Sequence, residues 1–83
     1  MRTYDGLSVV LTEKLHELYG LTPGTAEYRR IERLLGQYCY EAEEYLSVAE
    51  LRLLKGTLSI SGRAWQRYKA AFVAGIPPEA NNA

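Results

Sequence analysis

The sequence has little of what most enzymes and metal sites depend on. Its 83 residues include one Cys, Cys39, and one His, His16. A single Cys excludes an internal disulfide and any Cys-rich metal site. His16 has no nucleophile or metal ligand at a useful spacing, so we expect it to have an ordinary surface role. These absences predict a protein that is not an enzyme and that has no metal and no cofactor.

Long apolar runs are also absent. The longest ones are far too short to cross a bilayer, and no apolar stretch follows the basic residue near Met1. A free Cys39, if it is buried, suits a reducing compartment. The sequence therefore predicts a cytoplasmic protein with no membrane partner.

Acidic residues are missing between Leu51 and Pro78. The formal net charge of the chain is zero, but residues 1–50 carry five Lys and Arg against nine Asp and Glu, whereas residues 51–83 carry five against Glu79 alone. Such asymmetry favours a basic face for an anionic partner. Head-to-tail self-association, or solubility alone, would explain it equally well.

What the chain has in quantity is apolar residues at helical spacing. Steps of three and four over residues 25–55 predict one long central amphipathic helix. A chain this short buries only about 60–65% of its unfolded surface, so we predict a helical homodimer that adds to the core. The apolar positions predicted to form the dimer interface are Tyr28, Ile31, Leu35, Tyr38, Ala42 and Tyr45.

Two positions leave the path of this helix open. Gly36 costs about 1 kcal/mol relative to Ala in a helix, so either a neighbour packs closely there or the helix bends. Ser47 and Glu50 have the spacing of a capping box, which would break the helix near Leu46. The apolar pattern continues in phase through this point, and we therefore predict a continuous helix.

A shorter helix is predicted on each side of the central one. Ser8 can cap a first helix over 9–19, after an irregular start at 1–7. Thr22 and Thr25 are alternative starts for the central helix. Ser61 can cap a last helix over 62–74, and residues 79–83 should fray. The prediction is a single all-α domain of three to four helices.

Three long hydrogen-bond donors share one face of the predicted last helix. In the major groove, Arg can read guanine and Gln can read adenine, and the donors on this face are Arg63, Gln66 and Arg67. Three further cations could contact phosphates, namely Lys55, Arg52 and Lys69. The C-terminal segment therefore predicts DNA as a partner.

The same segment resembles a known family. Residues 58–68, which include the run Ser61-Gly62-Arg63-Ala64-Trp65-Gln66, are similar to the recognition helix of small phage repressors of the Cro/C1 class. Those repressors place an Ala-and-Gly helix before the turn, which residues 51–57 lack. The resemblance implies a helix-turn-helix transcription regulator of phage or mobile-element type.

A second stretch, residues 15–30, looks like the helix-turn-helix of sigma-factor region four and related response regulators. Gly20 stands at the turn, and Thr25 opens the second helix. That resemblance would direct four residues toward the groove, namely Thr25, Glu27, Tyr28 and Arg29.

A protein partner is the alternative. The last helix could simply cover the core with Trp65 and Phe72, and the Tyr-rich and acidic surfaces could bind another protein. Glu41, Glu43 and Glu44 would then face a basic partner. A neutral net charge favours this inhibitor or adaptor, because DNA-binding domains usually carry a clearly basic surface.

Overall fold

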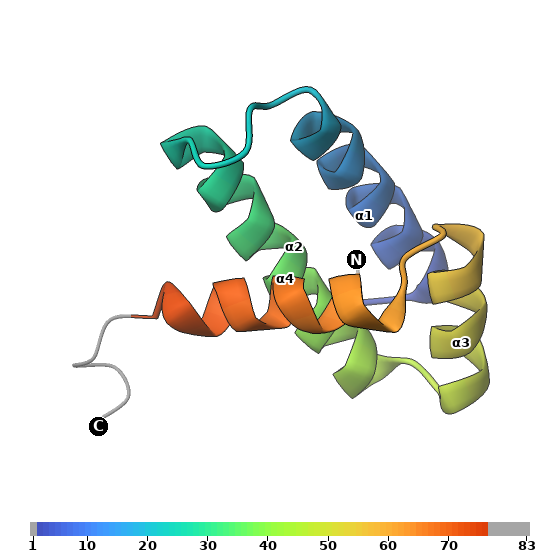
Figure 1. Ribbon diagram of the computed structural model, residues 1–83. Helices are drawn as coiled ribbons and strands as arrows, with labels where there is room; N and C mark the ends of the chain where they lie inside the picture. Colours follow the sequence, from blue (N-terminus) through green and yellow to red (C-terminus); the bar gives the residue numbers. More distant parts are fainter. Residues whose placement is uncertain (1, 77–83) are drawn as a thin grey trace.

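The computed structural model describes residues 2–76, and within that range the chain forms four helices and no strand. They are α1 (Tyr4–Tyr19), α2 (Ala26–Tyr45), α3 (Val48–Thr57) and α4 (Gly62–Ala74). The predicted all-α fold class is confirmed. Figure 1 shows α1 and α2 side by side, α3 at one end of the pair, and α4 crossing α2.

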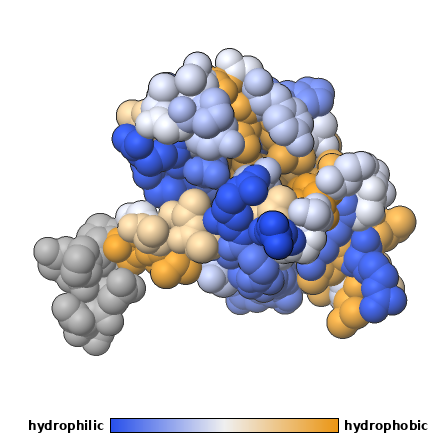
Figure 2. All heavy atoms as spheres, viewed as in Figure 1, coloured by the Kyte–Doolittle hydropathy of each residue, from blue (hydrophilic) through white to orange (hydrophobic). Residues whose placement is uncertain are grey.

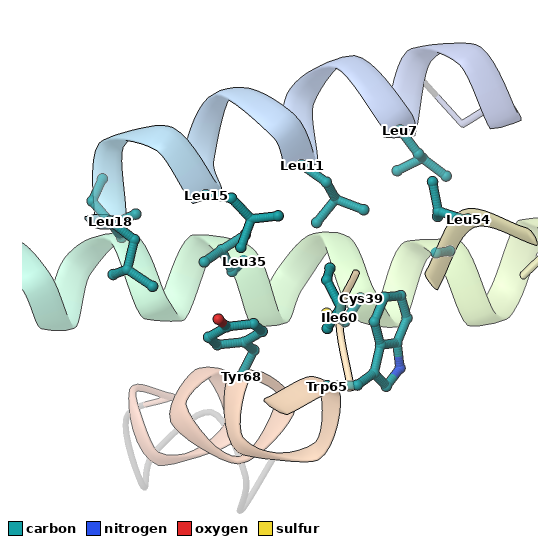
Figure 3. Packing of buried hydrophobic residues seen from close by; sticks show 12 residues of the cluster. Leu7, Leu11, Leu15, Leu18, Leu35, Cys39, Leu54, Ile60, Trp65 and Tyr68 are labelled. Atoms are coloured by element: carbon teal, nitrogen blue, oxygen red, sulfur yellow. The ribbon is translucent and has the colours of Figure 1, made fainter. Parts of the chain in front are cut away.

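The core lies between α1, α2 and α4. α1 contributes four leucines at steps of three and four, and α2 contributes the stripe of Ile31, Leu35, Cys39 and Ala42. Trp65 and Tyr68 of α4 close the other side, with Ile60 near Trp65, and Leu54 of α3 lies near Leu7 (Figure 3). As the periodicity predicts, α2 is amphipathic, and its apolar stripe faces two different helices of the same chain.

The predicted continuity of the central helix over 25–55 is wrong. The chain leaves the helical conformation at Leu46, whose φ of −100° and ψ of 151° are extended. Ser47 then caps α3, because its side chain accepts the backbone N–H of Glu50 while the Glu50 carboxylate accepts the N–H of Ser47, at 3.1 and 3.0 Å. The capping box outweighs the in-phase apolar pattern, because it satisfies donors that a new helix start would otherwise leave free.

The predicted start of the first helix is also wrong. α1 begins at Tyr4, and its cap is Thr3, whose hydroxyl accepts the N–H of Gly6 at 3.1 Å. Residues 4–7 are therefore helical, and Leu7 is fully buried. An Asp-Gly pair such as Asp5-Gly6 favours a turn, but a carboxylate in the first helical turn is favourable at the positive end of the helix dipole. The predicted fraying of residues 79–83 lies outside the described residues.

α4 packs closely on α2 at Gly36. A Cβ added to Gly36 would meet the backbone oxygen of Tyr68 at 2.0 Å and the Cβ of Phe72 at 2.6 Å. The sequence left two alternatives for Gly36, a close neighbour or a bend in the helix, and the structure has the close neighbour. The crossing divides α2 into an N-terminal half and a C-terminal half, which lie on opposite flanks of α4.

Candidate nucleic-acid interface

α3 and α4 are consecutive helices joined by a short turn, and together they are called the α3–α4 unit. α3 ends at Thr57 and α4 begins at Gly62, so four residues connect them. Ser61 caps α4 by accepting the N–H of Ala64 at 3.0 Å, as predicted. A connection of three or four residues is also usual between the two helices of helix-turn-helix motifs.

The turn between these helices has a defined geometry. The N–H of Ile60 donates to the carbonyl of Lys55 at 3.0 Å, and the N–H of Ser59 donates to the carbonyl of Gly56 at 3.1 Å. These two bonds make a Schellman motif, in which the residue after the helix cap adopts a left-handed conformation. Ser59, with φ of 56°, takes the place where Gly is usual.

Buried side chains hold this unit on the rest of the molecule. Leu54 of α3 and Trp65 of α4 are fully buried, and Ile60 and Tyr68 are nearly so. Leu58 packs against the same core. Leu58 and Ile60 therefore attach the turn itself to the core.

The opposite face of α4 is exposed and polar. Arg63, Gln66 and Arg67 are all exposed, and hydrophilic atoms gather over the middle and N-terminal part of this helix in Figure 2. Arg67 has one acidic neighbour, because its Nε lies 3.8 Å from a carboxylate oxygen of Glu32. Its guanidinium also lies over the Tyr68 ring, 5.3 Å from the centroid. The three predicted base-reading residues thus share one accessible face.

The three residues predicted to contact phosphates differ in exposure and in their partners. Arg52 is exposed on α3. Lys69 is half-buried, and its ammonium donates to both carboxylate oxygens of Glu43, at 2.7 and 2.9 Å. Lys55 is also half-buried, with its ammonium 4.7 Å from the centroid of the Trp65 ring. Both lysines therefore have partners inside the fold, and Lys69 already has a counter-charge.

Glu43 is bonded to two side chains of α4, although its own side chain stays 31% exposed. Its carboxylate accepts the indole N–H of Trp65 at 2.7 Å in addition to the Lys69 bonds. Burial raises the pKa of this carboxyl, but the hydrogen bonds from Lys69 and Trp65 outweigh it and hold the pKa below its usual value. Glu43 is therefore ionised in the folded protein at neutral pH.

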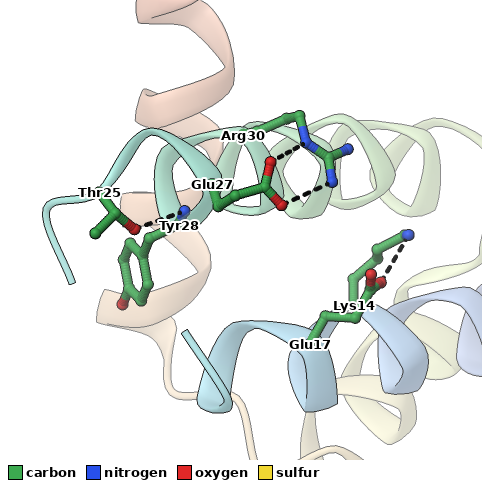
Figure 4. Close-up of polar contacts among 6 residues, drawn as sticks. All are labelled: Lys14, Glu17, Thr25, Glu27, Tyr28 and Arg30. Atoms are coloured by element: carbon green, nitrogen blue, oxygen red, sulfur yellow. Dashed lines mark hydrogen bonds and ion pairs between the residues drawn. The ribbon is translucent and has the colours of Figure 1, made fainter. Parts of the chain in front are cut away.

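The second resembling stretch, residues 15–30, uses its polar groups locally (Figure 4). Thr25 caps α2 by accepting the N–H of Tyr28 at 3.2 Å, which decides between the two predicted starts. Glu27 pairs with Arg30 at 3.4 Å, and this contact raises the pKa of the Arg30 guanidinium. Arg29 donates to the carbonyl of Gly24 at 2.8 Å.

The six residues predicted to form a dimer interface divide into two groups. Ile31, Leu35 and Ala42 are almost completely buried in the core of their own chain. The other three, Tyr28, Tyr38 and Tyr45, keep part of their surface in contact with solvent. α1 and α4 of the same chain thus cover the part of the apolar stripe that the prediction assigned to a second copy.

Sequence reasoning did not place two arginines of α2 beside α4, although Arg29 was predicted to face the groove as part of the 15–30 stretch. Arg29 and Arg33 lie on the N-terminal half of α2, and with Ala71, Ala74 and Gly75 they line a hollow of about 260 Å³. In the sequence this half belongs to the acidic part of the chain, and only the crossing of the helices brings it to α4. No local pattern signals such a tertiary contact.

Residues with reactive side chains are inactive or isolated. Burial raises the pKa of the Cys39 thiol to about 12, and His16 is exposed. Among residues 2–76, no group of three or more His, Cys, Asp or Glu side chains is placed to hold a metal ion. No helix in this range combines the length and the apolar character that crossing a bilayer requires.

Comparison with known proteins adds no relative. No family model matches the chain, and neither the curated proteins nor the solved structures that were searched gave a match. Function is therefore inferred from the geometry of the chain itself.

Proposed function

We propose that this protein is a small transcription regulator, of the kind found in phages and mobile elements, that binds duplex DNA through α4. The observation that carries the proposal is the exposed face of Arg63, Gln66 and Arg67 on the second helix of the α3–α4 unit, which in this proposal acts as a helix-turn-helix. In proteins of this architecture, the second helix lies in the major groove and its N-terminal residues contact base edges.

Each residue of this face has a distinct role in the proposal. Arg67 and Arg63 present forked donors that suit the two acceptors of guanine, and Gln66 suits adenine. Arg52, on the first helix of the unit, contacts a phosphate. Lys69 and Lys55 make a smaller contribution, because Glu43 and the Trp65 ring already hold their ammonium groups.

The proposal is tested by selecting a preferred duplex from a random library with the wild-type protein and measuring affinity by fluorescence anisotropy. Arg67→Ala should weaken binding to that duplex about 5- to 150-fold, which corresponds to about 1–3 kcal/mol. It should also relax the preference at one base pair. The matched control is Lys14→Ala, a paired cation on α1 away from this face, and it should bind like the wild type.

Two results would contradict the proposal. One is a selection that enriches no sequence, together with no binding to any duplex at moderate salt. The other is an Arg63, Arg67 double neutral variant that keeps wild-type affinity and preference. In both cases, circular dichroism of each variant must first show that its helices are intact.

A protein partner is the second candidate, and one observation favours it. Tyr45, Val48 and Leu53 are 44%, 74% and 60% exposed, and orange atoms project at the edge formed by α3 in Figure 2. Large exposed apolar side chains are typical of protein contacts where they form a continuous patch. If this surface binds a protein, Tyr45→Lys should abolish the effect of the protein in cells. If the protein acts only by binding DNA through α4, the substitution should leave that effect unchanged.

The homodimer remains a prediction, and sedimentation tests it. The tyrosines Tyr28, Tyr38 and Tyr45 are the predicted interface residues that a second copy could still reach. A two-chain mass at micromolar concentration, lowered by Tyr45→Lys, would support the dimer. A single-chain mass at high micromolar concentration would contradict it.

A further inference from the structure

The N-terminal half of α2 lies along one flank of the exposed face of α4. Arg67 of α4 lies beside Glu32, and the side chain of Arg33 packs across Gly75, at the end of α4. The fit at Gly75 is tight, since an added Cβ there would lie only 2.2 Å from the Cδ of Arg33. Arg33 of α2 is thus held against the C-terminal end of α4, the helix that carries Arg63 and Arg67.

A hollow separates the two helices on this flank. It has a volume of about 260 Å³, and α4 lines it only with the small residues Ala71, Ala74 and Gly75. Arg29 and Arg33 line the other side. Small residues let a large partner come close to the backbone of α4, and the two arginines supply cationic donors at the same place.

The two arginines differ from their neighbour in pairing. Arg30, between them in sequence, forms an ion pair with Glu27 at 3.4 Å. Among residues 2–76, neither Arg29 nor Arg33 has a carboxylate oxygen within 4.0 Å. The hydrogen bond from Arg29 to the Gly24 carbonyl at 2.8 Å fixes its guanidinium and leaves other N–H groups free to donate.

The local charge has the sign that an anion requires. This flank and the face of α4 together carry five arginines, and the glutamates within reach are Glu27 and Glu32. Both glutamates are already paired, with Arg30 and Arg67 respectively. The hollow therefore faces cations whose charge is not cancelled locally.

We propose that the hollow between Arg29, Arg33 and the small residues of α4 holds a backbone phosphate of the DNA strand that borders the groove occupied by α4. The inference rests on the proposed function and extends it to a second element. Guanidinium groups suit phosphate because they donate parallel hydrogen bonds to its oxygens. Contacts of this kind set the register of a protein on the duplex without reading its sequence.

The test measures how the affinity of the full chain for the selected duplex depends on salt. Each phosphate contact contributes about 0.9 to the slope of log K against log salt. Both arginines hold the same phosphate, so the Arg29→Gln, Arg33→Gln double variant should lower the slope by about one and leave the base preference unchanged. Ala74→Glu, which places a carboxylate in the hollow, should weaken binding to all duplexes alike.

Arg30→Gln is the matched control, since it removes a paired arginine from the same turn, and it should change the slope by much less than one. A double variant with the wild-type slope, in a protein whose preference still depends on Arg67, would overturn this inference alone. Absence of any duplex binding by the wild type would overturn the proposed function, and this inference with it. If millimolar inorganic phosphate lowers the affinity of the wild-type protein for the duplex as much as the double substitution does, the hollow binds free phosphate and not a DNA strand.

Discussion

The carboxylate of Glu43 accepts the indole N–H of Trp65 at 2.7 Å, and this bond fixes α4 to the C-terminal half of α2. Trp65 has no solvent exposure, so water cannot replace Glu43 as the acceptor. The same carboxylate holds Lys69. One side chain of α2 thus satisfies two donors of α4.

Removal of this carboxylate should destabilise the fold. Glu43→Ala leaves the buried N–H of Trp65 without an acceptor, and such a loss costs about 1–3 kcal/mol. Urea denaturation followed by circular dichroism measures the change. Glu44→Ala, an exposed neighbour, should stay within about 0.5 kcal/mol of the wild type. Equal stability of the two variants would contradict the role of Glu43.

The same contact predicts a dependence of stability on pH. The pKa of Glu43 in the folded protein is below its usual value of 4.5, which also applies to the unfolded chain. Between the two pKa values the unfolded state therefore binds more protons than the folded state. The contribution of Glu43 to stability is present above pH 4.5 and is lost as the pH falls through the folded pKa. Glu43→Gln should lose stability less steeply than the wild type between neutral and acidic pH.

A methyl group at the helix crossing should be costly. Gly36→Ala would place a Cβ 2.0 Å from the backbone oxygen of Tyr68, and overpacking of this kind costs about 1–3 kcal/mol or more. Gly56→Ala is the matched control, because nothing lies within 4 Å of its added Cβ. The control should be neutral or stabilised by up to about 1 kcal/mol. Thermal unfolding of both variants measures the change in stability, which should be a loss for Gly36→Ala and no loss for Gly56→Ala.

The turn before α4 holds a strained residue. Ser59 has a φ of 56°, a conformation that Gly adopts without a Cβ penalty. Ser59→Gly should therefore stabilise the protein by roughly 0.5–1 kcal/mol and leave DNA affinity unchanged. A decrease in the midpoint of urea denaturation would show that the Ser59 hydroxyl contributes more than the strain costs.

The Cys39 thiol should be unreactive in the folded protein. It has no solvent exposure, and its pKa of about 12 leaves very little thiolate at neutral pH. Labelling with a thiol-specific disulfide reagent should be slow until denaturant is added. Rapid labelling in native buffer would mean that α2 opens locally without global unfolding.

Local signals in the sequence predicted the local features correctly. Ser61 as the cap of α4 follows from a few neighbouring residues. At Gly36 the sequence left a close neighbour and a bend as alternatives, and the structure has the close neighbour. The break at Leu46 had a local signal too, the Ser47–Glu50 capping box. The continuous helix was predicted in spite of this signal, because Tyr45 and Ala49 keep the helical phase across the break. Both residues are exposed in the structure.

Features that depend on how helices cross were beyond the sequence. Arg29 and Arg33 reach α4 only because the crossing at Gly36 places one half of α2 beside it. Lys69 appeared to be a free cation because its partner, Glu43, is 26 residues away in the chain. Pairing across such a separation is set by packing, which composition and periodicity do not encode.

The burial of Trp65 also gives the protein a built-in optical probe. It is the only tryptophan in the chain, and its indole is enclosed by the core, by the Glu43 carboxylate and by the Lys55 ammonium. Fluorescence emission from an indole shifts to longer wavelength when water reaches the ring. The emission spectrum of the unlabelled protein therefore reports whether α4 is docked on α2.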